Sequence, residues 1–265
     1  MQASRISGVL RARFALAGGA TRLADMHEAG GIRLKLPRGD HCQAVMVNVG
    51  GGLTGADRLD VALTLDAGAE ATFTTQSAEK IYRADGGETI VDARVALAQG
   101  ATLIWAPQET LLFEGARLRR RLTIAMAPES SLTLIESAVF GRLAHGESSA
   151  DSHVRDSWRV SRGGQLLIAE ETHVEGARVL DRAALGDGAR ASATLILVGR
   201  HAARSLEPLR ALFEARAEDG VDAGVSVIED RLFARALARD PARLRSALRE
   251  AIIIATGRAL PRVWT

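Results

Sequence analysis

Hydrophobic and polar residues alternate over most of the chain before about residue 200, and the alternating runs end at turns rich in glycine or serine. A period of two is typical of a β-strand with one buried face. The runs come in pairs that read as strand, turn, strand. No unit can bury its apolar face alone, so we expect the units to stack on one another. The units occupy residues 61–73, 95–105, 122–134, 158–168 and 185–195.

This repetition predicts a mainly β protein, built as a β-helix or solenoid-like stack of strand–turn–strand units. An ordinary β-sandwich also shows regularly spaced turns and stays open as the alternative. Further strands are expected ahead of the repeats, at residues 6–17, 21–25, 32–36 and 44–49.

Helical periodicity is confined to the end of the chain, where Asp240-Pro241 is a helix start signal. Pro241–Ala255 is the clearest helix because its apolar residues share one face. A weaker helix is expected at Ser205–Ala217 and a strand at Val225–Leu237. No linker is found, so we expect a single domain over residues 1–265. It comprises a solenoid body to about residue 200 and a helix-containing part after it.

Composition removes several classes of function. The formal net charge of +2 is too small to indicate nucleic-acid binding. Cys42 is the only cysteine, so neither an internal disulfide nor a cysteine cluster for a metal can form. No apolar leader or run of membrane-spanning length occurs, and we expect a cytoplasmic protein.

The most unusual stretch is Thr74–Arg83, a polar segment that directly follows an apolar strand and holds the only tyrosine. It is either a solvated turn or an internal polar network whose groups satisfy one another. The preceding Gly50-Gly51-Gly52 lacks the motif and the helix of a phosphate-binding loop. His145 and Glu147 are weak candidates for a metal site, and no G-x-S-x-G nucleophile motif occurs.

Arg117, Arg119 and Arg121 would share one face of a strand. They either protect a solvated edge or form a docking surface for an acidic partner. A hydrolase on a β-solenoid, using Glu79, Glu109 or Glu136 as paired carboxylates, is the alternative function. The chain has only ten aromatic residues (three Trp, one Tyr and six Phe) to form glycan-stacking platforms, which disfavours that class.

Read in order, the segments of this chain resemble the urease accessory protein UreD (UreH) family. The matching residues are Val47-Asn48, Gly51-Gly52-Leu53, Asp57-Arg58, Thr74-Thr75-Gln76, Ala78-Glu79-Lys80-Ile81-Tyr82-Arg83, Pro107-Gln108-Glu109-Thr110, Ala116-Arg117-Leu118-Arg119-Arg120, Glu136-Ser137, Phe140-Gly141-Arg142, Gly146-Glu147, Asp156, Trp158-Arg159 and Pro261-Arg262-Val263-Trp264. The chain departs from the family pattern at Ala56, where glycine is usual, and at His145, where methionine is common.

The resemblance implies a β-helical scaffold without enzymatic activity or a cofactor of its own. It implies binding to apo-urease and to UreF, which recruits the GTPase UreG, and delivery of nickel, held only transiently, through a hydrated internal channel. No nucleic-acid or membrane partner is expected.

Three groups of residues follow as expectations. Gln76, Glu79, Gln108, Glu109 and Glu136 would line the channel, unless the glutamates instead form salt bridges to Arg83 or Arg142. The surrounding polar network would consist of Asp57, Lys80, Tyr82, Arg83 and Arg142. A surface facing UreF would contain Leu248, Ile252 and Trp264.

Overall fold

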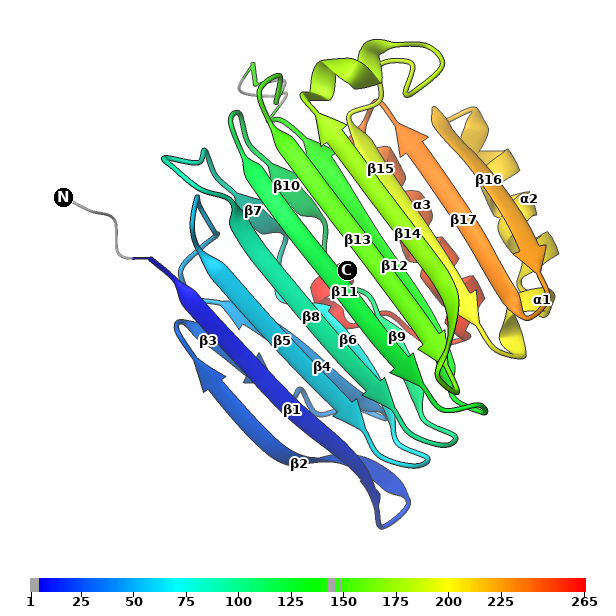
Figure 1. Cartoon of the computed structure of the whole chain (residues 1–265). Helices are drawn as coiled ribbons and strands as arrows, with labels where there is room; N and C mark the ends of the chain where they lie inside the picture. Colours follow the sequence, from blue (N-terminus) through cyan, green and yellow to red (C-terminus); the bar gives the residue numbers. More distant parts are fainter. Residues whose placement is uncertain (1–4, 143–145, 148) are drawn as a thin grey trace.

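The computed structural model describes residues 5–142, 146–147 and 149–265, and consists of two β-sheets packed face to face (Figure 1). The first sheet has the strand order β14-β13-β11-β8-β5-β1-β2. Its strands are β1 (Ser7–Ala17), β2 (Ala20–Ala29), β5 (Arg58–Leu65), β8 (Thr89–Leu97), β11 (Arg117–Met126), β13 (His153–Arg162) and β14 (Gln165–Glu175).

The second sheet has the order β16-β17-β15-β12-β9-β6-β4-β3, with β10 and β7 continuing beside β12. Its strands are β3 (Ile32–Lys35), β4 (Cys42–Asn48), β6 (Glu70–Thr75), β7 (Glu79–Ile81), β9 (Thr102–Trp105), β10 (Thr110–Leu112), β12 (Ser131–Phe140), β15 (Ala191–Val198), β16 (Val221–Ile228) and β17 (Arg231–Ala238).

The solenoid-like stack predicted from the sequence is confirmed. In the first three repeat units the two strands lie in opposite sheets, because the chain crosses the core from β5 to β6, from β8 to β9 and from β11 to β12. Equivalent strands of successive units pair in parallel, so that Val61 lies beside Ala93 and Phe73 beside Trp105. Stacking therefore buries the apolar face that each unit presents.

The last two units depart from this pattern. Residues 158–168 form part of an antiparallel hairpin, β13–β14, within the first sheet. Residues 185–190 form no strand: Leu185 is 52% exposed, in turns that follow a short 3-10 helix at Ala177–Asp181. The strand expected at Val225–Leu237 is a hairpin of β16 and β17, which turns at Glu229 with a positive φ of 55°.

The main core lies between the sheets, and a second core lies between the second sheet and the helices α2 (Leu206–Ala217) and α3 (Pro241–Thr256). A single turn, α1 (His201–Arg204), leads into α2. Among the described residues, no helix is long and apolar enough to cross a membrane. β17 pairs with β15, so the C-terminal part continues the second sheet.

The clearest predicted helix is confirmed as α3. Asp240 caps it by accepting a hydrogen bond from the Ala242 amide at 2.8 Å, and Gly257 ends it in the left-handed conformation. Leu248, Ile252 and Trp264 were expected to face a partner because apolar side chains at the end of the chain would need one to bury them. That premise is wrong. They are 3%, 3% and 1% exposed because α3 and the C-terminal turn cover the second sheet of the same chain.

Candidate functional site

Polar side chains meet inside the protein, at a cavity of about 60 Å³ between the two sheets. Most of its wall is apolar, including Phe73 and Trp105, whose rings stack at 4.4 Å. Its polar lining is Thr75, Glu79, Gln108, Thr110, Arg120 and Glu136. A cavity of this size has room for a few water molecules beside its polar groups.

Arg120 organises the polar wall. It lies on the inner side of β11, and its guanidinium donates to both carboxylate oxygens of Asp156, at 3.0 and 2.5 Å, and to Glu136 at 2.5 Å. Two indoles complete the group: Trp105 donates to Glu136 and Trp158 donates to Asp156, each at 2.8 Å. Every member therefore has a partner, as burial requires.

This buried group has more acid than base. Two carboxylates share one guanidinium, so the group is negative when both are ionised. Burial raises the pKa of Glu136, and the ion pair with Arg120 opposes that rise. Glu79 lines the same cavity, and its burial raises its pKa to about 7. The cavity therefore favours a proton or another cation near these carboxylates.

A second cavity of about 60 Å³ adjoins the first, since both are bordered by Met46, Thr75 and Glu79. It lies under the glycine loop and is lined by Gln76 and by Asn48, whose side chain donates to Glu79 at 2.9 Å. Glu79 thus stands between the interior cavity and the loop end of the sheets.

The glycine loop comes close to the segment after Glu79. Gly52 has a φ of 147°, and a Cβ there would lie 2.8 Å from the Lys80 carbonyl oxygen and 2.5 Å from the Tyr82 ring. Leu53 donates its amide to the same Lys80 oxygen at 2.8 Å. Glycine is therefore required for this approach.

Two other residues expected in the polar network, Asp57 and Arg83, help to hold the loops in place. Asp57 is buried and accepts from the amides of Ile6 and Thr54 at 2.7 and 2.8 Å. The Arg83 carbonyl accepts from the Thr54 hydroxyl at 2.7 Å. The Lys80 side chain is exposed.

Tyr82 and Arg142 meet at Phe113. Tyr82 packs edge-on against the Phe113 ring at 4.8 Å, and the Arg142 guanidinium lies over that ring at 4.5 Å. Arg142 also pairs with Glu147. Glu147 is one of the two candidate metal ligands, and the other, His145, lies outside the described residues. Within the described ranges 5–142, 146–147 and 149–265, no group of three or more histidine, cysteine or acidic side chains could hold a metal ion.

Glu109 departs from the expected channel. It borders neither cavity and pairs with Arg245 of α3 at 2.6 Å. Gln108 accepts from the same guanidinium at 2.6 Å and donates to the Val263 carbonyl at 2.6 Å. Glu136 therefore pairs with Arg120 and Glu109 with Arg245, not with Arg83 or Arg142 as the alternative supposed, while Glu79 is hydrogen-bonded to Asn48. Gln108 links the cavity to the C-terminal segment.

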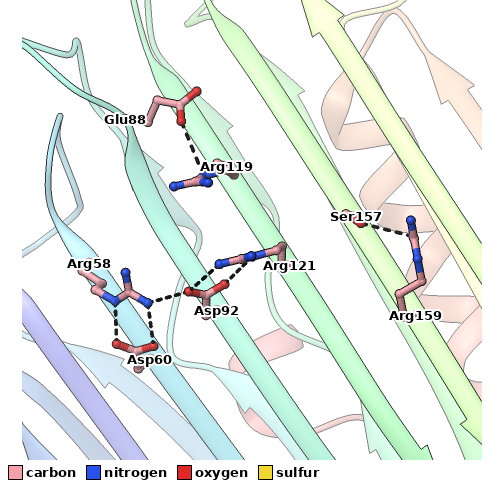
Figure 2. Close-up of polar contacts among 8 residues, drawn as sticks. All are labelled: Arg58, Asp60, Glu88, Asp92, Arg119, Arg121, Ser157 and Arg159. Atoms are coloured by element: carbon pink, nitrogen blue, oxygen red, sulfur yellow. Dashed lines mark hydrogen bonds and ion pairs between the residues drawn. The ribbon is translucent and has the colours of Figure 1, made fainter.

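Strand alternation places Arg117, Arg119 and Arg121 of β11 on the outer face of the first sheet, opposite to the buried Leu118 and Leu122. Figure 2 shows Arg119 and Arg121. Arg121 donates to Asp92 of β8 at 2.8 Å, and Arg119 approaches Glu88 at 3.5 Å. Arg117 is exposed. β11 is flanked by β8 and β13, so it is an interior strand, and protection of a sheet edge does not explain these charges.

Comparison with known proteins identifies the family. The family model described as UreD urease accessory protein matches residues 7–265. The chain belongs to the UreD family. It is 45% identical to the urease accessory protein UreD of Methylobacterium sp. (strain 4-46) over 255 residues, which cover 94% of this chain and 90% of that protein. It is 44% identical over 249 residues to the UreD of Beijerinckia indica subsp. indica, covering 93% and 92% of the two chains.

In this UreD-family chain, the sequence pattern predicts Glu79, Gln108 and Glu136 as residues of the interior site. It does not predict the ion group around Arg120. Arg120 was overlooked because it stands in a run of arginines whose neighbours face outward. Strand alternation carries the signal that could have found it, since Arg120 has the same parity as the buried Leu118 and Leu122. Asp156 and Trp158 likewise share the parity of the buried Val154.

The departure at Ala56 has a structural cost. Ala56 adopts a φ of 66°, in the left-handed region where a Cβ is unfavourable and glycine is favoured. The glycine usual in the UreD family at this position has a direct conformational reason.

Proposed function

We propose that this protein is a non-enzymatic scaffold for urease maturation in the cytoplasm, where it binds apo-urease and UreF. UreF in turn recruits UreG, and nickel passes transiently through the interior of the scaffold on its way to the urease active site. Membership in the UreD family supports the role in urease maturation. The adjoining cavities bordered by Glu79 support the route.

The observation that carries the nickel proposal is the surplus of carboxylate at the interior cavity. Glu79 and Glu136 line a space that has room for water, and one buried guanidinium serves both Glu136 and Asp156. Carboxylate and amide oxygens are hard ligands, which hold a divalent ion loosely when they are few at each depth. Loose binding suits passage better than storage.

The hydrolase alternative loses support from the same geometry. Glu109 pairs with Arg245 and does not border the cavity lined by Glu136. That cavity, at about 60 Å³, is much smaller than ordinary ligand pockets of roughly 300 Å³ or more. The geometry therefore does not favour catalysis by paired carboxylates.

Removal of this gene from its host, followed by nickel analysis of purified urease, tests the proposed function. We expect urease protein with little nickel and little activity, restored by the gene in trans. The native chain should also co-purify with UreF and apo-urease. Full nickel loading without this protein would overturn the proposal.

A further inference from the structure

The outer face of the first sheet differs from that of the second. The helices α2 and α3 cover the outer face of the second sheet, whereas no described helix covers the first (Figure 1). Outward positions of three adjacent strands, β8, β11 and β13, carry one carboxylate, Asp92, among six arginines. The arginines are Arg94, Arg117, Arg119, Arg121, Arg155 and Arg159. We propose that this arginine face docks an acidic surface of a folded protein partner.

Part of the face is rigidly organised. Asp92 is only 3% exposed, and it accepts from Arg121 at 2.8 Å and from Arg58 of β5 at 2.7 Å. Arg58 in turn donates to Asp60 at 2.9 Å, giving the chain of contacts drawn in Figure 2. These carboxylates fix the two guanidiniums while leaving some of their N–H groups free. A preorganised donor loses less conformational entropy when it binds.

The rest of the face is less fully neutralised where the structure describes it, with two unpaired arginines and two long ion pairs. Among the described residues, Arg94 and Arg117 are exposed and form no ion pair. Arg119 is 3.5 Å from Glu88, and its Nε is covered from solvent without a hydrogen-bond acceptor. Arg159 is 3.6 Å from Glu171. The guanidiniums of Arg94 and Arg117 are therefore the ones available to carboxylates of another molecule.

The chemistry of the face favours carboxylates on a protein. The positively charged residues of the face are all arginines, and the planar guanidinium of arginine binds carboxylates in a bidentate manner. The positive charge is local, since the whole chain has 34 basic and 32 acidic residues. A general attraction to nucleic acid would need a larger net charge. Strand alternation spreads the arginines over a sheet surface, which suits a broad partner rather than a small ligand.

The choice of partner to test rests on the proposed function, under which apo-urease and UreF are the candidates. The experiment compares the full chain with the double variant Arg94→Glu/Arg117→Glu. The matched control is Arg200→Glu/Arg204→Glu, which reverses the same number of exposed arginines at α1, beside the second sheet. Thermal unfolding checks that both variants are folded. Affinity for purified UreF and for purified apo-urease is then measured at about 50 and about 300 mM sodium chloride.

We expect the Arg94→Glu/Arg117→Glu variant to bind one partner at least about ten-fold more weakly than the unaltered chain does at low salt. Its affinity should also depend less on salt. The control should bind normally. Equal affinity of both variants for each partner would overturn the docking face and leave the proposed function intact. Failure of the unaltered chain to bind either protein would instead overturn the proposed function. If the Arg94→Glu/Arg117→Glu variant lost binding to a short DNA duplex while its binding to both proteins was unchanged, the face would be a nucleic-acid site. That result would overturn the proposal of a protein partner.

Discussion

Replacing Glu79 by glutamine tests the electrostatics of the interior site. Glu79 lies at the junction of the two cavities, where burial raises its pKa from an ordinary 4.5 to about 7. The folded chain therefore holds the proton more tightly than the unfolded chain does. This stabilising contribution is fully present below about pH 4.5 and is lost as the pH rises through about 7.

The size of the effect follows from the shift. A difference of one pKa unit corresponds to about 1.36 kcal/mol, so the carboxylate costs about 3 kcal/mol once it is ionised in the folded chain. Glutamine stays neutral and keeps an oxygen that can accept the hydrogen bond from Asn48. Glu79→Gln should therefore become more stable relative to the unaltered chain as the pH rises.

Urea denaturation at pH 5 and pH 8, followed by circular dichroism, measures this difference. We expect the free energy of unfolding of Glu79→Gln, relative to the unaltered chain, to increase by about 2.5 kcal/mol between the two values, because the unfolded carboxyl is already mostly ionised at pH 5. Glu214→Gln, at an exposed position of α2, is the control and should show no such change. If the two variants behave alike, Glu79 is not ionised at a cost, and the argument for a cation-favouring interior fails.

Three further substitutions test the packing. Arg120→Met leaves two buried carboxylates without their cation and should cost about 3–5 kcal/mol in chemical denaturation, and a neutral result would contradict the buried ion group. Trp264→Ala should cost a similar amount, about 3–5 kcal/mol, because the indole is 1% exposed; an unchanged melting temperature would show that the C-terminal segment does not pack on the sheet. Ala56→Gly should raise the stability by up to about 1 kcal/mol by relieving the positive φ, whereas a loss would mean that the Ala56 methyl group contributes more by packing.

Periodicity was sufficient for the architecture where each strand has one buried and one exposed face. The alternation in 95–97 reports such a strand, β8, whereas Ile104 of β9 is buried in the second core although the alternation predicts an exposed position. Alternation does not report which sheet a strand joins, so residues 158–168 read like the earlier units although they form an antiparallel hairpin. The apolar stripe of α3 was equally clear, but a stripe does not say whether the same chain or a partner covers it.

The interior site was only partly accessible to sequence reasoning, because it depends on contacts between distant strands. Glu136 lies 16 residues after Arg120 and Asp156 lies 36 residues after it, yet the three form one ion group. The polar segment after β6 marked Glu79 correctly as unusual. Nothing in the local pattern distinguishes Glu109, which pairs with α3, from Glu136, which lines the cavity.

The most direct test of the nickel route is the metal content of urease matured with the variant Glu79→Leu. This change removes the carboxylate between the two cavities and replaces it with an apolar side chain of similar length. Glu214→Leu serves as the control. Our account predicts that the Glu79→Leu protein still co-purifies with UreF and apo-urease, while the nickel content and activity of the urease fall well below those obtained with the control. Urease fully loaded with nickel in the presence of Glu79→Leu would contradict it.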